Sequence, residues 1–147
     1  HVAHIYGKAF DVLDRSSTVS SVVLKFVSFD RIVEGLSRLK ALPNLSSLHI
    51  SHSDLNNLIQ INHLVPLTGL TSLTLEEVPL RSSSLLRPYT LFRLPNLSEF
   101  NGQHVSSRDR EQANSLFASY KRTVARVLHV DRSDTSGGGG ATSAARV

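Results

Sequence analysis

Large apolar residues recur along this chain at a fixed spacing, and this spacing restricts the possible folds more than any other feature. A leucine, a second apolar residue three positions later and a third two positions after that occur from Leu45, and again 25 residues on from Leu70. The pattern starts once more at Leu97, 27 residues further, and Val19 begins a similar one 26 residues before Leu45. A repeat of this length indicates short units that stack side by side along one axis.

Each unit is expected to hold one strand and one return segment. The apolar spacing predicts strands over residues 22–27, 47–51, 72–76 and 97–101. It predicts returning helices over residues 31–40 (capped by Asp30), 56–64 (capped by Asp54) and 85–93 (broken near Pro88). Neither a strand nor a return can bury its apolar side alone, so neighbouring units share one core. The predicted fold class is therefore α/β, a solenoid of parallel strands with helical or 3₁₀ returns.

The chain divides into three parts. Residues 1–18 are apolar but irregular, and we expect them to cover the first core edge or to end an upstream repeat. Residues 19–130 are assigned to about four repeats and a C-terminal cap helix that begins at about residue 106. Residues 131–147 include a run of four glycines and have little to bury, so they are expected to be disordered. A start at His1 without any methionine suggests a fragment of a longer protein.

The predicted cap helix has a clear beginning. Ser106 followed three residues later by Asp109 is typical of a capping box. Apolar residues then recur at helical spacing, and Leu116, Phe117 and Tyr120 are expected to be buried against the last repeat.

Composition excludes several classes of function. The chain has no cysteine, and therefore neither disulfides nor a thiolate zinc site, which is compatible with a reducing compartment. No apolar run approaches the roughly 18 residues of a membrane helix. The net charge is only +4, so nucleic acid is not the expected partner. The cap helix carries a secondary basic surface at Lys121, Arg122 and Arg126, either a solvated helix face or a docking site for an acidic partner.

The last repeat resembles the C-terminal cap of intracellular leucine-rich-repeat proteins. The matching residues are Leu94-Pro95-Asn96-Leu97, Phe100-Asn101-Gly102, Val105-Ser106, Asp109-Arg110 and Ala113. Further upstream the match includes Tyr6-Gly7, Leu24-Lys25-Phe26-Val27, Phe29-Asp30, Pro43-Asn44-Leu45, Leu58, Gln60 and Arg87-Pro88-Tyr89. Together, roughly residues 5–120 look like the C-terminal repeat block of the leucine-rich-repeat subunit of the tubulin polyglutamylase complex.

This resemblance implies a scaffold rather than a ligase, associated with microtubules, cilia and basal bodies. Its expected partners are proteins: subunits of a larger complex, tubulin, or a tubulin-modifying enzyme. The sequence departs from the family where repeats often have an asparagine that bonds neighbouring turns. Val27, Ser53 and Val78 stand there instead, which predicts a weak hydrogen-bond ladder.

The concave face of the solenoid, the side of the sheet turned away from the returns, is the candidate binding surface. Neighbouring residues on a strand point to opposite faces, so equivalent non-core positions form rows across the strands. The candidate partner-binding residues are Val23, Lys25, His49, Ser51, Thr74, Glu76, Asn101 and Gln103. A face that is merely solvated is the alternative.

Catalysis and metal binding have weaker support. His52, Glu77 and His104 fall in one predicted row and are possible zinc ligands, but a solvated row of turn residues is the simpler interpretation. Nothing places a serine nucleophile beside a base on a sharp turn. We therefore expect no catalytic residue, no metal and no cofactor. The sequence favours an intracellular, non-enzymatic protein-binding scaffold of the cytoplasm or cytoskeleton. The alternative is an RNA-processing or signalling adaptor that binds another protein or a nucleic acid.

Overall fold

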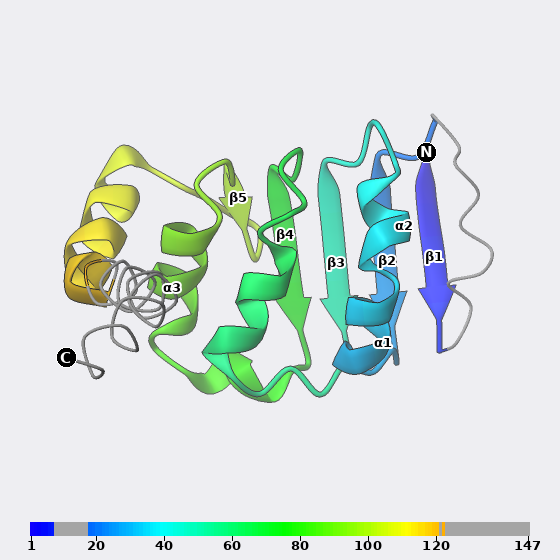
Figure 1. The fold of residues 1–147 in the computed structure, drawn as a ribbon, viewed down its shortest axis with the longest axis horizontal. Coiled ribbons are helices and arrows are strands. Elements are labelled where there is room, and N and C mark those ends of the chain that lie inside the picture. The colour runs from blue at the N-terminus through cyan, green and yellow to red at the C-terminus, as the bar shows by residue number, and fades with distance from the viewer. Residues whose placement is uncertain (8–17, 121, 123–147) are drawn as a thin grey trace, which may run out of the picture.

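The computed structural model describes residues 1–7, 18–120 and 122, and within them it is a row of strands backed by helical segments (Figure 1). The strands are β1 (Val2–Tyr6), β2 (Ser21–Lys25), β3 (Ser47–Ser51), β4 (Ser72–Glu76), β5 (Glu99–Phe100) and β6 (Gln103–His104). The returns are α1 (Phe29–Glu34), α2 (Leu36–Lys40), the 3₁₀ helices η2 (Leu58–Leu64) and η3 (Pro79–Ser82), and α3 (Leu86–Arg93). A further helix covers residues 107–120. Residues 131–147, expected to be disordered, lie outside the described part.

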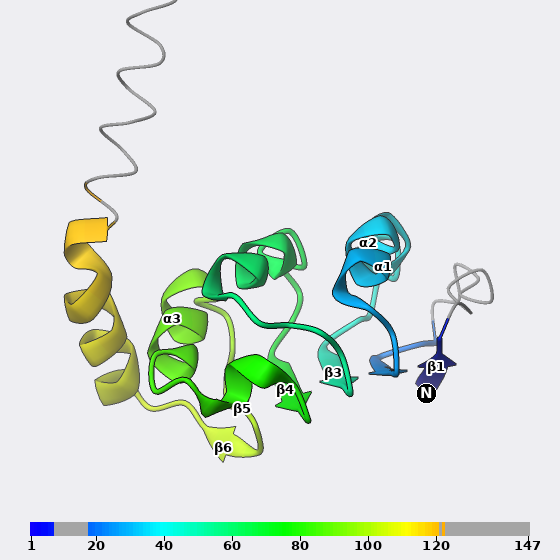
Figure 2. The same cartoon turned by 90° about the horizontal axis from the view of Figure 1, so that it is seen from below.

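The strands form one sheet in chain order, from β1 to β6. The pairs from β1 to β5 are parallel, and only β5 with β6 is antiparallel. Seen from below, the strands lie along one side and the helical segments along the other (Figure 2). The α/β solenoid predicted from the apolar spacing is thus confirmed. Strand β1 lies in residues that the sequence analysis left as a cover or the end of an upstream repeat.

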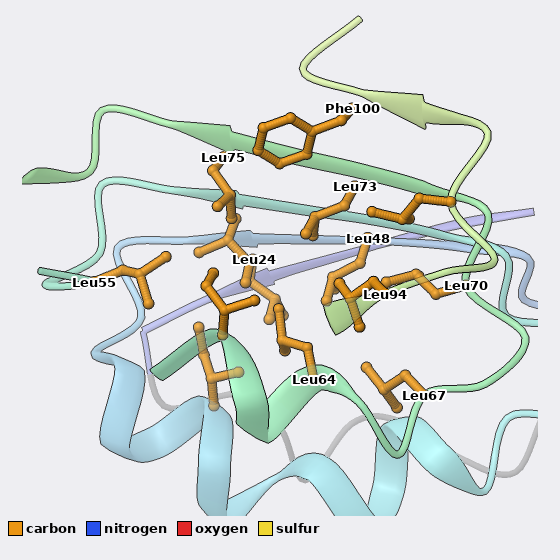
Figure 3. Close-up of a cluster of buried hydrophobic side chains, with 14 of the residues drawn as sticks. Leu24, Leu48, Leu55, Leu64, Leu67, Leu70, Leu73, Leu75, Leu94 and Phe100 are labelled. Atoms are coloured by element: carbon orange, nitrogen blue, oxygen red, sulfur yellow. The ribbon is translucent and has the colours of Figure 1, made fainter. Parts of the chain in front are cut away.

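The core is a stack of repeated apolar positions. Leu24, Ile50 and Leu75 are aligned by the strand register and are fully buried. Leu48 and Leu73 make the neighbouring row, and Phe100 continues it in β5 with 2% of its surface exposed (Figure 3). Burying a leucine side chain stabilises the folded state by about 1.5–3 kcal/mol. Each strand buries its leucines only against neighbouring repeats, so a single repeat would not be stable alone.

The first return differs from the single helix predicted over residues 31–40. It is two short helices that meet at Gly35, whose N–H donates to the carbonyls of both Arg31 and Ile32. The N-cap is Ser28 rather than Asp30, which lies in the first turn. The prediction failed because serine and aspartate are comparable caps, and only the backbone geometry decides between them.

The second return is a 3₁₀ helix capped by Asn57, so the prediction that Asp54 caps it was wrong. Asn57 and Gln60 form a capping box in which Gln60 Oε1 accepts from the Asn57 N–H at 2.9 Å. Asp54 instead accepts from the Phe29 N–H at 2.6 Å. It therefore stabilises the start of α1 in the preceding repeat, a contact that only stacking creates.

The third return contains no break at Pro88. Helix α3 begins at Leu86, so Pro88 lies in the first turn, where the missing N–H removes no helical hydrogen bond.

The three positions where related repeats often have an asparagine are buried and form no side-chain hydrogen-bond ladder. Val27 and Val78 are buried apolar residues, and the buried hydroxyl of Ser53 has no hydrogen-bond partner. The asparagine ladder of related repeats is thus absent at these three described positions.

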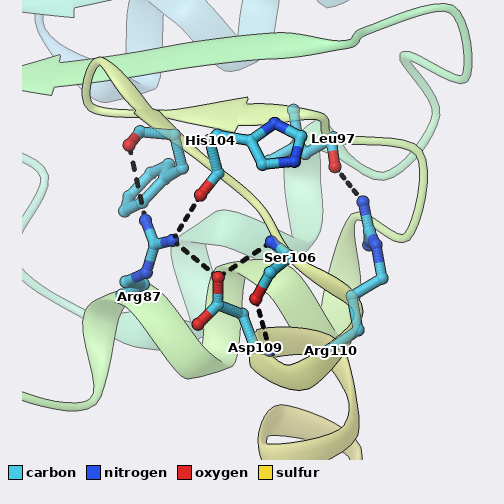
Figure 4. Close-up of polar contacts among 7 residues, drawn as sticks. Arg87, Leu97, His104, Ser106, Asp109 and Arg110 are labelled. Atoms are coloured by element: carbon cyan, nitrogen blue, oxygen red, sulfur yellow. Dashed lines mark hydrogen bonds and ion pairs between the residues drawn. The ribbon is translucent and has the colours of Figure 1, made fainter.

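The C-terminal cap begins with the predicted capping box. Asp109 accepts from the Ser106 N–H at 2.9 Å, and Ser106 Oγ accepts from the Asp109 N–H at 3.1 Å. Arg87 of α3 binds the same carboxylate at 3.2 Å and also donates to the carbonyls of Phe100 and His104 (Figure 4). Arg110 donates to the carbonyl of Leu97. These bonds fasten the cap helix to the last repeat.

The cap helix packs less deeply than expected. Ala113 is buried, but Leu116 is 54% exposed and Tyr120 is 38% exposed. Phe117 is half-buried and contacts the rings of Tyr89 and Phe92, with centroids 5.3 and 5.4 Å apart. The prediction of three buried residues was therefore wrong for Leu116 and Tyr120. Helical spacing identifies the face that turns inward but not how far it is covered.

Candidate partner-binding face

The strand register brings the predicted rows of the concave face together. Val23, His49 and Thr74 are direct neighbours on β2, β3 and β4. Lys25, Ser51 and Glu76 form the next row in the same way. Strand β1 extends both rows, because His4 pairs with Val23 and Tyr6 pairs with Lys25. The sequence analysis missed these two exposed residues, although the Tyr6-Gly7 pair was a visible signal.

Accessibility divides the candidates. Glu76 is exposed and Lys25, His49 and Thr74 are half-buried, so these four can be touched by a partner. Val23 is only 9% exposed and Ser51 is 2% exposed. The Ser51 hydroxyl is also buried without a hydrogen-bond partner. Alternation along the strands assigned both side chains to the concave face, but both are buried there and are not accessible to a partner.

One polar bridge spans the centre of the face. His49 Nε2 lies 3.1 Å from Glu76 Oε2, so the imidazole of β3 and the carboxylate of β4 are hydrogen-bonded across one strand step. Both groups remain partly exposed. The bridge is a polar contact between side chains of neighbouring repeats. An isolated surface pair of this kind contributes little to the free energy of folding.

Asn101 and Gln103 leave the predicted rows. Asn101 and Gly102 both have positive φ, 51° and 75°, and they form a tight turn that reverses the chain. Gln103 therefore pairs antiparallel with Phe100 instead of continuing beside Glu76. Asn101 Oδ1 accepts from the Leu75 N–H at 2.7 Å, which commits its side chain to the sheet. Asn-Gly is the strongest short hairpin signal in a sequence, and the repeat frame concealed it.

The predicted row of possible zinc ligands does not form. His52 and Glu77 follow β3 and β4 at equivalent positions, but His104 pairs with Glu99 in the final hairpin. Among the described residues, no group of three or more His, Cys, Asp or Glu side chains could hold a metal ion.

A left-handed backbone follows each of three parallel strands. Phe26, His52 and Glu77 have φ values of 56°, 54° and 48°, and Gly7 takes the same conformation after β1 at 62°. The left-handed conformation costs a non-glycine residue about 1–2 kcal/mol. Because this left-handed conformation recurs after four strands, the turn from each strand to its return segment requires it. The sequence analysis left these turn residues out of the binding face.

A third row, at the start of the strands, consists of Ser21, Ser47, Ser72 and Glu99, which the strand register aligns. Beyond the opposite end of β4, an open hollow of about 760 Å³ is lined by Glu76, Glu77, Val78, Pro79, Arg81 and Ser82. A partner segment that follows the ends of the strands would meet this hollow at the acidic side of the face.

Of the secondary basic surface, only Arg122 belongs to the described residues. It is exposed, and its Nε donates to the carbonyl of Ala118 at 3.5 Å. Lys121 and Arg126 lie outside the described part. No helix in that part is long and apolar enough to cross a membrane.

A family model described as leucine-rich repeat matches residues 8–128 of this chain. The chain belongs to the leucine-rich-repeat family. Human leucine-rich repeat-containing protein 49 is 34% identical in an alignment of 125 positions that covers 77% of this chain and 18% of that protein. Human U2 small nuclear ribonucleoprotein A' is 31% identical over 90 residues, 59% of this chain and 33% of that protein. The chain thus spans less than a fifth of the first leucine-rich-repeat relative and a third of the second.

Solved structures show the same leucine-rich-repeat fold. The Drosophila melanogaster SNF/U2A' complex matches with a TM-score of 0.56 and 20% identity, over 69% of this chain and 57% of that one. The Chaetomium Mex67:Mtr2 subunits match with a TM-score of 0.51 and 20% identity, over 65% and 62%. Both structures contain protein complexes.

Proposed function

We propose that this chain is the protein-binding part of a non-enzymatic scaffold, and that its partner binds the concave face. The observation that carries the proposal is the His49–Glu76 bridge at 3.1 Å, with Lys25 and Thr74 beside it. These side chains lie on the side of the sheet opposite the buried leucines. They are therefore available to a partner without loss of core packing. In a solenoid, such a face offers a continuous surface built from several repeats.

The specific complex we propose is the tubulin polyglutamylase complex, with the chain as part of its leucine-rich-repeat subunit. Support comes from the sequence resemblance over roughly residues 5–120 and from the shared cap around Ser106 and Asp109, whose hydrogen bonds the structure contains. On this proposal the protein is intracellular, at microtubules or basal bodies. Its partners are other subunits of the complex, tubulin, or a tubulin-modifying enzyme.

A second candidate is an RNA-processing adaptor, favoured by the 31% identity to the U2 ribonucleoprotein protein over 90 residues. The two candidates predict different partners. The first predicts co-purification with a polyglutamylase ligase and tubulin, and the second predicts spliceosomal proteins together with RNA.

The test is affinity purification of the whole protein in wild-type form and as a combined His49→Ala, Thr74→Ala, Glu76→Ala variant. His49 and Glu76 are hydrogen-bonded to each other, so replacing both leaves no unpaired polar group behind. The variant is therefore expected to stay folded. Exposed substitutions usually change the free energy of unfolding by less than about 0.5 kcal/mol. We expect the variant to lose the ligase and tubulin.

The matched control is Lys40→Ala with Ile59→Ala on the return segments, where both side chains are exposed. Gln60 is unsuitable as a control because its side chain closes a capping box. Loss of the partner in the control but not in the concave variant would place the binding face on the other side of the solenoid.

A further inference from the structure

An exposed aromatic cluster lies at the end of the first strands, where the row of Tyr6 and Lys25 meets the turn residues Phe26 and His52. Phe26 is 63% exposed, and its ring stacks on His52 with centroids 4.5 Å apart and planes 30° apart. Tyr6 is 55% exposed and is the β1 neighbour of Lys25, the residue before Phe26. We call Tyr6, Lys25, Phe26 and His52 the aromatic platform.

Folding gives no reason for an aromatic side chain at position 26. The turn after each strand requires a left-handed backbone, which glycine adopts freely and asparagine tolerates. Gly7 shows that the turn forms with no side chain at all. Phe26 therefore combines an unfavourable backbone conformation with an apolar ring left in water. A residue that is costly on both counts is best explained by what it binds.

The charges around the platform differ from those on the rest of the sheet. In residues 2–7, 21–26 and 47–52, which hold β1, β2 and β3, the ionisable side chains are Lys25, three histidines and Tyr6, with no carboxylate. In residues 72–77 and 99–100, which hold β4 and β5, they are Glu76, Glu77 and Glu99, with no basic group. The strands β1 to β3 thus carry one lysine, the aromatic rings and no carboxylate, and β4 and β5 carry three glutamates. Asp54, two residues after His52, lies beyond these strands and accepts from the Phe29 N–H.

We propose that the aromatic platform receives an acidic segment of a partner protein, which places a large apolar side chain on Phe26 and His52 and a carboxylate at Lys25. This inference rests on the proposed function and names the chemistry of its partner. The charge polarity also fixes the direction of the segment, because its acidic part must lie over β1 to β3, away from the three glutamates.

A nucleic acid fits the same surface less well. Bases stack on aromatic rings, but a phosphate backbone needs a positively charged groove along its whole path. Lys25 is the single lysine or arginine on the strands β1 to β5, and Glu76, Glu77 and Glu99 would repel phosphates. The observations favour a peptide.

The experiment measures binding of labelled synthetic peptides to the whole chain by fluorescence anisotropy. The probes are a glutamate-rich peptide with one central tryptophan, the same peptide with serine at the centre, and a lysine-rich peptide with the tryptophan. We expect the acidic tryptophan peptide to bind about tenfold more tightly than either other peptide. Tighter binding of the lysine-rich peptide, or of a labelled oligouridylate, would overturn the inference.

The decisive variant is Phe26→Asn, because asparagine keeps the left-handed turn and removes the ring. We expect a melting temperature no more than about 2 °C below wild type and an affinity for the acidic tryptophan peptide about tenfold weaker. Tyr6→Ser removes a second exposed ring, from a strand position with ordinary backbone conformation. It should also weaken binding of the acidic tryptophan peptide. The matched control is Glu77→Asn, the same turn two repeats on, which should leave affinity within about twofold.

These outcomes separate the inference from the proposed function. If Phe26→Asn and Tyr6→Ser bind the acidic peptide as wild type does, the platform is not the site. The His49, Thr74 and Glu76 variant changes no platform residue, so its loss of partner would still support the concave face.

Discussion

At the scale of single residues, side chains of one type have different roles according to what covers them. Phe100 is 2% exposed beside Leu73 of β4, Phe117 is half-buried against two rings, and Phe26 is 63% exposed to solvent. Their chemistry is identical, so burial alone decides whether each contributes to folding. The apolar spacing marked Phe100 and Phe117 as core, but it gave no measure of how completely each is covered.

Phe100, Phe117 and Leu116 differ in burial, and this difference predicts a graded series of losses in stability. Phe100→Ala should cost about 3–5 kcal/mol of the free energy of unfolding, the usual loss for a buried phenylalanine. Phe117→Ala should cost about 1–3 kcal/mol, because part of its ring is already in water and its contacts to Tyr89 and Phe92 are two aromatic pairs. Leu116→Ala should change it by less than about 0.5 kcal/mol.

Urea unfolding of the three variants checks this order. A Leu116→Ala loss as large as that of Phe117→Ala would show that the outer side of the cap helix is covered in solution.

At the scale of elements, the hairpin from β5 to β6 ends the parallel sheet. Asn101 and Gly102 supply the two positive φ values that a two-residue hairpin needs, and the Asn101 side chain also bonds the Leu75 N–H. The turn thus prevents β4 from presenting an unpaired N–H at the point where the neighbouring strand departs.

Asn101→Ala should cost about 2–3 kcal/mol, because alanine is unfavourable in the left-handed conformation and the Leu75 N–H loses its acceptor. Asn101→Gly keeps the backbone and loses only the hydrogen bond, so it should cost about half as much. Chemical denaturation of both variants measures the difference. Equal costs would mean that the side-chain bond, rather than the turn, carries the effect.

The cap helix introduces a pH dependence. Hydrogen bonds from Ser106, and then the Arg87 guanidinium, hold the pKa of Asp109 below its ordinary value. A depressed pKa means that the stabilisation is complete above the ordinary carboxyl pKa and is lost as pH falls through the value in the folded protein. Above about pH 5 it should therefore be constant.

The measurement compares wild type with Asp109→Asn. We expect the wild type to be more stable at neutral pH, with a difference that stays level down to about pH 5 and shrinks below about pH 4. A difference that grows on acidification would contradict the direction of the pKa shift. Ser106→Ala should reduce the difference, because the Ser106 side chain is one of the groups that lower the pKa of Asp109.

At the scale of the whole molecule, stability depends on neighbouring repeats. The longest ladders join β1, β2, β3 and β4, each pair aligned over five residues, while β4 and β5 are aligned over two. Among the described strands, only β2 and β3 have a long parallel neighbour on both sides. In a stack of this kind, local opening begins where fewer neighbours hold a strand.

Amide hydrogen exchange should therefore be slowest in β2 and β3, and faster in β1, in β4 and in the hairpin from β5 to β6. Exchange followed by mass spectrometry measures it strand by strand. Equal protection in all strands would indicate that the sheet opens only as a unit.

The sequence alone determined the repeat, the order of the strands and the rows of buried leucines. It could do so because the strand and its return each bury one side, so the apolar positions must recur with the fold. The strands β3 and β4 were predicted to the residue, and the Ser106–Asp109 capping box was predicted from its spacing. These are local features, set by residues close together in the chain.

Only the tertiary structure decided what depends on residues far apart in the chain. Asp54 accepts from the Phe29 N–H 25 residues earlier, and Asn101 accepts from the Leu75 N–H 26 residues earlier. Val23 and Ser51 are buried although they belong to the concave face. Phe26 meets His52 only because stacking places equivalent turns side by side. A repeat pattern assigns a side chain to one face of the sheet. How accessible that side chain is depends on how the neighbouring repeats pack against it, and only the tertiary structure determines this packing.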